Sequence, residues 1–176
     1  MTIEKWDILD KNGIPTGKTT TRGQVFLKPG EYHLVVHIWV ISSDGKFLIQ
    51  RRSDKKKLMP GEWAATGGAA IAGEDSFTAA SRELFEELGI KMDTDIAKKA
   101  FRMIRRRNSI LDVWVVCDNT PVGDLALQET EVAEAKWVTE TELKEMITNG
   151  KFHNYGDEYF SRVFDETKNY RGALLV

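Results

Sequence analysis

The sequence has little cysteine and no long apolar run, and each shortage excludes a class of protein. Its single cysteine, Cys117, excludes an internal disulfide and favours a reducing compartment. No apolar run approaches the roughly 18 residues of a membrane-spanning helix, and the first residues contain no apolar signal-peptide core. The formal net charge of -2 gives no overall attraction to nucleic acid or to an anionic membrane. We therefore predict a cytoplasmic protein that binds neither nucleic acid nor membrane.

What the sequence does contain suits one folded domain. Its 176 residues are 41% hydrophobic and 30% charged, which is enough apolar material for a core, and we predict a single domain over residues 1–176. Strand-like and helix-like segments occur together without a regular strand–helix–strand series. This arrangement favours a mixed sheet packed by helices over a doubly wound parallel sheet.

Local patterns indicate the individual elements. Strands are predicted from apolar runs and alternation at 5–10, 32–41, 46–52, 98–107, 110–118 and 134–139. Turns and loops are predicted at 11–17, 51–63 and 64–74, the last of them rich in glycine. Helices are predicted at 76–88, 140–150 and 159–170. The near-continuous apolar run at 32–41 indicates a strand that is buried on both faces.

The first predicted helix has clear signals at both ends and one apolar face. Asp75 or Ser76 can cap its start, and Gly89 can end it. Apolar residues at helical spacing form one stripe, made of Phe77, Ala80, Leu84 and Leu88. We therefore expect this helix to pack one side against the core.

Three glutamates, Glu83, Glu86 and Glu87, crowd the last turns of this helix. The helix dipole and their mutual repulsion each oppose them by ~0.2–1 kcal/mol. A divalent cation would resolve the conflict, and hard carboxylate oxygens favour Mg²⁺ or Mn²⁺. The carbonyl of Gly67 can turn toward the same ion, and the basic loop upstream could hold phosphates, so these parts suit metal-assisted attack of water on a diphosphate. For the glutamates alone, a solvated acidic face is the alternative.

The full spacing is more specific than the glutamates. The chain reads G-x5-E-x7-REL-x-EE-x-GI from Gly68 to Ile90, so every fixed position of the Nudix box is filled. The chain therefore resembles the Nudix hydrolases, the MutT-like enzymes. The resemblance implies a three-layer α/β/α sandwich with a mixed sheet, with the Nudix box at residues 68–90. It also implies hydrolysis of a nucleoside diphosphate linked to another moiety.

The resemblance also implies roles for the acidic residues. Glu83, Glu86 and Glu87 would be the catalytic and metal-binding glutamates, and the carbonyl of Gly67 would be a further metal ligand. Glu83, or a glutamate outside the box, would activate water. Glu131 is the candidate outside the box, although a solvated loop charge explains it equally well.

Other positions of the box have supporting roles in this resemblance. Arg82 is a candidate catalytic residue. Its main role, like that of Glu74, would be to hold the loop against the helix. Gly68 and Glu74 are structural positions of the box, as is Gly89.

Upstream of the box, the chain resembles the bacterial branch that includes isopentenyl-diphosphate isomerase. Arg22, Arg52 and Lys56 fall where that isomerase has basic residues for a diphosphate, so all three are candidate substrate-binding residues. Trp63 follows a loop glycine and is the tryptophan best placed to line a cleft, although strand tryptophans more often lie in a core.

The departures from the isomerase point to a hydrolase. The isomerase needs a reactive cysteine between Trp63 and Glu74, where this chain has none, and its own Nudix box is degenerate. We therefore predict a metal-dependent hydrolase that acts on a nucleoside diphosphate derivative or a related small diphosphate. The alternatives are an isomerase-like enzyme and a non-catalytic nucleotide-binding module. A homodimer is left open.

Overall fold

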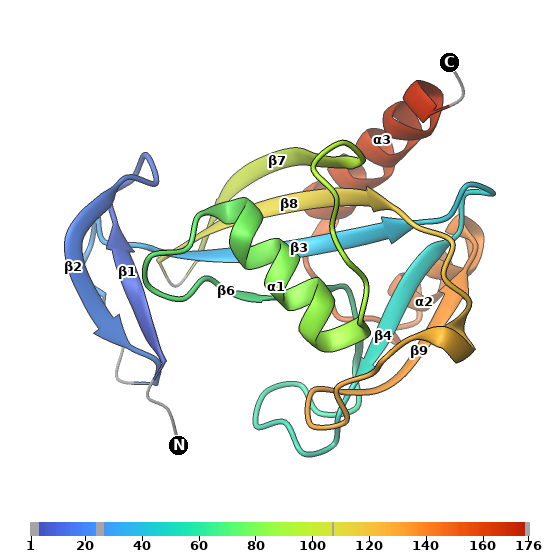
Figure 1. Ribbon diagram of the computed structural model, residues 1–176, viewed down its shortest axis with the longest axis horizontal. Helices are drawn as coiled ribbons and strands as arrows, with labels where there is room; N and C mark the ends of the chain where they lie inside the picture. The colour runs from blue at the N-terminus through green and yellow to red at the C-terminus, as the bar shows by residue number, and fades with distance from the viewer. Residues whose placement is uncertain (1–3, 24–26, 107, 175–176) are drawn as a thin grey trace.

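The computed structural model describes residues 4–23, 27–106 and 108–174 (Figure 1). Its elements in chain order are β1 (Lys5–Leu9), β2 (Pro15–Thr21), β3 (His33–Ile41), β4 (Phe47–Arg52), β5 (Trp63–Ala64), β6 (Thr66–Ala69), α1 (Ser76–Leu88), β7 (Ala97–Arg105), β8 (Ser109–Cys117), the 3-10 turn η1 (Val122–Asp124), β9 (Val132–Val138), α2 (Glu140–Thr148) and α3 (Asp157–Leu174). No helix among these described residues is long and apolar enough to cross a membrane.

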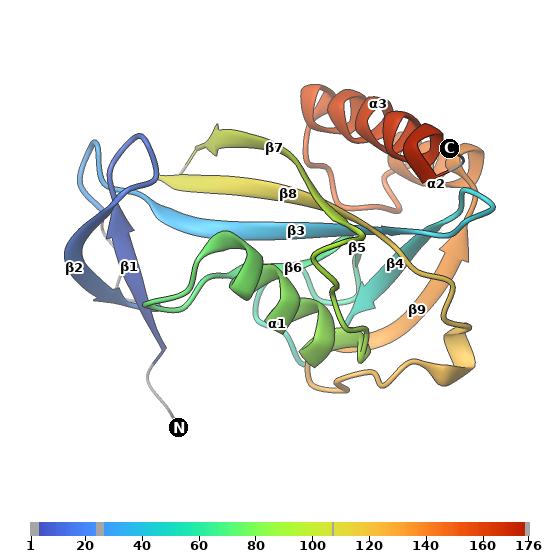
Figure 2. The ribbon, with the colours of Figure 1, turned by 45° about the horizontal axis from the view of Figure 1, so that its top comes forward.

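The central sheet is mixed, as the sequence predicts. Its main path runs β5-β4-β3-β8-β7, with β6 paired to β3 and β9 paired to β4. The β3–β8 pair is parallel and the other pairs are antiparallel. Helix α1 covers one face of this sheet and α3 covers the other (Figure 2). The predicted three-layer α/β/α class is therefore confirmed.

Strand β3 is buried on both faces, also as predicted. Period-two alternation sends Val36 and Ile38 into the core beneath α1, and it sends Trp39 and Ile41 into the core beneath α3. Each of these four residues is at most 1% exposed. The strand thus supports the helix that carries the glutamates from one side and is itself covered from the other.

Two predicted irregular segments are strands in the structure. The glycine-rich segment 64–74 was expected to be a loop, but β6 pairs within it against β3. A Cβ on Gly67 would lie 2.2 Å from the Val36 carbonyl oxygen, so glycine permits this close pairing and does not mark a loop here. The predicted turn at 11–17 is shorter than expected, because β2 begins at Pro15 and pairs with β1.

The remaining boundaries differ little from prediction. Helix α3 begins two residues before the predicted start at residue 159, and the strand predicted at 98–107 spans Ala97–Arg105. Arg107 lies outside the described residues. The β1–β2 hairpin stands at one end of the sheet (Figure 1) and contacts the box loop, where the Ala72 N–H donates to the Lys5 carbonyl at 2.8 Å.

Candidate functional site

Helix α1 holds the glutamates in a fixed orientation because both of its ends are capped. The Asp75 side chain accepts from the Thr78 N–H at 2.7 Å. Gly89 ends the helix in the left-handed region, with φ 75°, and its N–H donates to the Phe85 carbonyl. The apolar stripe of the helix packs into the core with Leu84 fully buried. The glutamates therefore project from the flank of a helix that cannot rotate freely.

The three glutamates are in different environments. The side chain of Glu86 is 48% exposed, whereas that of Glu83 is 14% exposed and Glu87 as a residue is only 4% exposed. The Gln50 Nε2 donates to Glu87 Oε2 at 2.7 Å. Glu87 is thus the buried member of the cluster, and a neutral amide contacts its carboxylate.

Burial changes the acidity of two of these groups. Desolvation and then the charge of Glu83 raise the pKa of Glu87 to about 8, although the Gln50 hydrogen bond lowers it and the charge of Glu131 raises it further. Burial also raises the pKa of Glu83 above its usual range, opposed by the charge of Arg82. Within residues 4–23, 27–106 and 108–174, no cationic side chain forms an ion pair with Glu87.

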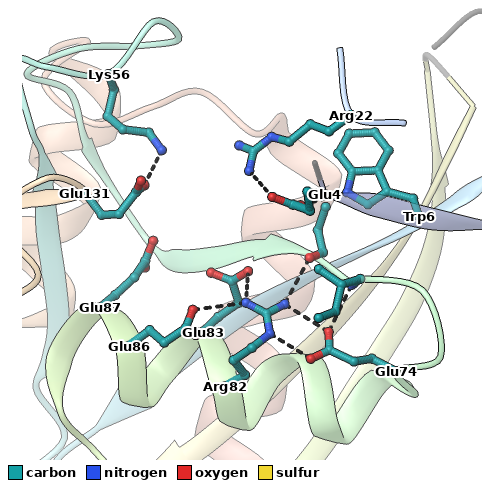
Figure 3. A network of polar contacts seen from close by, with 12 residues as sticks. Glu4, Trp6, Arg22, Lys56, Glu74, Arg82, Glu83, Glu86, Glu87 and Glu131 are labelled. Atoms are coloured by element: carbon teal, nitrogen blue, oxygen red, sulfur yellow. Dashed lines mark hydrogen bonds and ion pairs between the residues drawn. The ribbon is translucent and has the colours of Figure 1, made fainter. Parts of the chain in front are cut away.

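Arg82 joins the helix to the box loop (Figure 3). Its Nε donates to Glu74 at 2.7 Å and its Nη2 donates to the same carboxylate at 2.9 Å. Its Nη1 donates to Glu83 at 2.9 Å and to Glu86 at 3.2 Å. Its Nη2 also donates to the carbonyl of Ala69 at 3.2 Å. One guanidinium therefore neutralises the outer part of the acidic cluster and leaves Glu87 without a counter-charge.

Gly68 makes room for this arrangement. A Cβ at this position would lie 2.3 Å from Oε1 of Glu83, closer than any real Cβ contact. A side chain at residue 68 would therefore displace the Glu83 carboxylate from its present position beside strand β6. Gly67 adds a backbone hydrogen bond to Glu87, which lowers the pKa of that carboxyl.

Two loops meet beside the glutamates. The Ser53 N–H donates to the Glu131 carbonyl at 2.8 Å, and Lys56 Nζ forms an ion pair with the Glu131 carboxylate. Figure 3 shows this pair on the side of the cluster next to Glu87. Glu131 therefore lies near enough to act on Glu87 electrostatically, but it is already paired with a cation.

The β1–β2 hairpin brings a second cation to the opposite side. Arg22 Nη1 donates to Glu4 Oε2 at 2.7 Å, and the Trp6 indole N–H donates to Glu4 Oε1 at 2.8 Å. The charge of Glu4 raises the pKa of Glu83, so this carboxylate belongs to the same cluster. Glu4 was missed by sequence reasoning, since it lies far from the box. A predicted β1–β2 pairing could have identified Glu4, because this pairing places it opposite Arg22.

Two candidate residues lie apart from these polar contacts. Arg52 Nε donates to the Leu58 carbonyl at 3.2 Å. Trp63 packs against the core beneath α3, and Lys136 Nζ lies 4.3 Å from its ring centroid. The network around Arg82 includes neither residue.

The acidic residues do not form a ready set of metal ligands. In the part of the chain that the structure describes, no group of three His, Cys, Asp or Glu side chains gathers at metal-binding distances. The chemistry of the cluster nevertheless fits a divalent cation. Burial raises the pKa values of both Glu83 and Glu87, and a divalent cation beside them would favour both as anions.

Comparisons with known proteins agree with this geometry. Residues 31–159 match the NUDIX domain. An uncharacterized Nudix hydrolase of Listeria monocytogenes is 39% identical over 154 residues, which cover 87% of this chain and 90% of the relative. An isopentenyl-diphosphate Delta-isomerase of Streptomyces coelicolor is 35% identical over 85 residues, 48% of this chain and 43% of the isomerase. The crystal structure of DR0079 from Deinococcus radiodurans superposes with a TM-score of 0.74 at 22% identity, covering 90% of this chain and 97% of that one.

Proposed function

The chain belongs to the NUDIX domain family, and from this premise we propose that it is a metal-dependent hydrolase that cleaves the diphosphate linkage of a nucleoside diphosphate derivative or a related small diphosphate. One observation carries the proposal. Glu87 is a buried carboxylate that faces other carboxylates, and none of the described cationic side chains pairs with it. A buried carboxyl group with a strongly raised pKa is typical of a functional site.

The metal would be Mg²⁺ or Mn²⁺, in keeping with the general use of divalent cations by this family. Its ligands would be Glu83, Glu86 and Glu87 with the Gly67 carbonyl, and Glu131 after release from Lys56. When bound, the metal would lower the pKa of a water molecule and offset the charge of the diphosphate.

The chain's own residues would do the remaining work. Arg82 holds the box loop against α1 through Glu74, so that the positions of the glutamates do not depend on the substrate. Glu83, with one carboxylate oxygen committed to Arg82, would accept the proton of the attacking water, and Glu131 is the alternative base. A general base contributes typically 10²–10⁴-fold to rate.

Two cations on opposite sides of the cluster would bind the diphosphate. Arg22 comes from the hairpin and Lys56 from the loop after β4 (Figure 3), and each is paired with a glutamate in the absence of substrate. Phosphate oxygens would replace these carboxylates as acceptors. Arg52 and Trp63 would reach only the part of the substrate beyond the diphosphate.

A screen of nucleoside diphosphates, their conjugates and isoprenoid diphosphates tests the proposal, each with Mg²⁺ and with Mn²⁺. Cleavage of a P–O–P linkage, followed by ³¹P NMR and dependent on the added metal, is the expected result. If one compound binds tightly and no compound turns over with either metal, the protein is a binding module and the hydrolase proposal fails.

The isomerase relative supplies the second candidate function, because it is 35% identical to this chain over 85 residues. We infer that isomerisation is the weaker candidate, because the single cysteine of the chain lies far from the glutamates. Cys117 pairs with Ile41, four residues along β3 from His37, which is the partner of Gly67. It therefore lies ~13 Å along the strand from the level of Gly67. Burial also raises the pKa of its thiol.

We also propose that the protein acts as one domain in the cytoplasm. The free thiol of Cys117 is compatible with a reducing compartment. Fractionation of cells that express the tagged chain, with activity assayed in each fraction, tests this location.

A further inference from the structure

Gln50 is a buried amide within the strand that runs beneath the glutamates. It lies on β4 and is 1% exposed. Its partners across the two neighbouring strands are Ala64 on β5 and Ala135 on β9. Both alanines are buried and small, so they leave space for the long side chain of Gln50 to extend toward α1. The sheet thus provides a specific place for this side chain.

The two ends of the amide have different environments. The Nε2 donates to Glu87 Oε2 at 2.7 Å. The Oε1 has no hydrogen-bond partner among the described residues, and it is one of three such buried side-chain atoms. A buried carbonyl oxygen without a donor is unfavourable, and an aliphatic residue at this position would avoid the cost. The amide is therefore better explained by a role at the site than by packing.

The contact with Gln50 also fixes the orientation of the Glu87 carboxylate. An amide NH₂ only donates, so it holds Oε2 of the Glu87 carboxylate in one direction. The adjacent carbonyl of the amide offers an acceptor on the same side. Together the two atoms match a cation that carries water molecules, because a carboxylate binds the ion and an acceptor receives a proton from its water.

We propose that Gln50 is a positioning residue of the cation site, holding Glu87 through its Nε2 and accepting a hydrogen bond from a water molecule of the site through its Oε1. This inference rests on the proposed function, since it presumes that Glu87 binds a metal. It adds a residue outside the Nudix box that sets metal affinity without touching the substrate.

Two variants of different shape test the inference. Gln50→Met keeps the length of the side chain but cannot hydrogen-bond, and Gln50→Asn keeps the amide but is one methylene too short to reach Glu87. Thr167→Val is the matched control, a buried polar-to-apolar change on α3 whose hydroxyl bonds only its own helix. Circular dichroism melts establish that each variant is folded.

Mn²⁺ affinity is measured without substrate, by the electron paramagnetic resonance signal of the free ion. We expect the dissociation constant to rise by about 10–100-fold in both Gln50 variants, the usual effect of removing a partner of a metal ligand. Thr167→Val should stay within about two-fold of wild type, since independent sites do not couple. At saturating metal, the KM for the diphosphate substrate should be unchanged, because Gln50 is buried.

A double-mutant cycle shows whether Gln50 acts through Glu87. In a Glu87→Gln background, Gln50→Met should reduce Mn²⁺ affinity less than it does in the wild type, because the contact with Glu87 no longer holds a metal ligand and only the hydrogen bond to the water remains to be lost. Folded Gln50 variants that bind Mn²⁺ as tightly as wild type overturn the inference alone. A wild-type protein that neither binds Mn²⁺ nor hydrolyses any diphosphate overturns the proposed function itself.

Discussion

Replacement of Glu87 by glutamine should make the metal-free protein more stable, and increasingly so as the pH rises. Burial and the charge of Glu83 raise the pKa of Glu87 from its ordinary value of 4.5 to about 8 in the folded chain. The folded state therefore holds a proton that the unfolded state releases between these two values. A group with a raised folded pKa contributes stability that is complete below its unfolded pKa and lost as the pH rises through its folded pKa.

The size of the effect follows from the same linkage. In this window the free energy of unfolding of the wild type should fall by ~1.36 kcal/mol per pH unit relative to Glu87→Gln. Between about pH 5.5 and 7.5 the two proteins should diverge by ~3 kcal/mol, and above about pH 9 the difference should level off at no more than ~5 kcal/mol. Gln50 can donate to the new amide oxygen, so the variant keeps the buried contact.

Urea unfolding at a series of pH values, with a chelator present, measures this divergence. Glu86→Gln serves as the control, because its side chain is 48% exposed and neutralising it removes little desolvation. Added Mn²⁺ should stabilise the wild type more than Glu87→Gln, since only a ligand that binds the folded state raises its stability. A difference between the two proteins that stays flat from pH 5.5 to 9 would refute the reasoning about a buried, uncompensated carboxylate.

Further predictions concern turnover. Glu87→Gln and Glu86→Gln should each lower kcat by several orders of magnitude while the fold persists, and unchanged turnover in both would show that the cluster is a surface feature. Gly68→Ala should place a Cβ against the Glu83 carboxylate and displace it, which should remove most of the activity while the protein stays folded; a fully active Gly68→Ala enzyme would contradict this. Lys56→Ala should raise the KM for the diphosphate more than it lowers kcat, in steady-state assays. Isopentenyl diphosphate incubated with enzyme and Mg²⁺ should give no dimethylallyl diphosphate, and its formation at catalytic rates would overturn the hydrolase assignment.

The sequence predicted the helix and its glutamates because their signals are local. The two caps and the apolar stripe lie within residues 75–89, so the sequence of this segment alone is enough to predict the helix. The strand β6 was missed because its glycines resemble a loop in sequence. In the structure, Gly67 allows β3 to approach closely and Gly68 leaves room for the Glu83 carboxylate. That requirement becomes visible only when the partner strand is in place.

The partners of the glutamates could not be predicted for the same reason. Gln50 precedes Glu87 by 37 residues and meets it only because β4 passes beneath α1. Glu4 joins the cluster only because the β1–β2 hairpin stands beside the box loop. Arg22, Lys56 and Arg52 were proposed from a resemblance to the isomerase. The structure places Arg22 and Lys56 on opposite sides of the cluster (Figure 3), whereas Arg52 donates to the Leu58 carbonyl.

The distribution of charge also changes which glutamate argues most strongly for a metal. In sequence, the three glutamates oppose the helix dipole and one another by amounts of only ~0.2–1 kcal/mol each, which a solvated helix tolerates. In the structure, Arg82 compensates Glu83 and Glu86 directly, so those local penalties are largely met. Arg82 does not compensate the burial of Glu87. The raised pKa of Glu87 corresponds to a free energy several times larger than the helix-dipole and repulsion energies. The burial of Glu87, which has no cationic partner among the described residues, therefore argues for a cation at this site more strongly than the number of glutamates on the helix does.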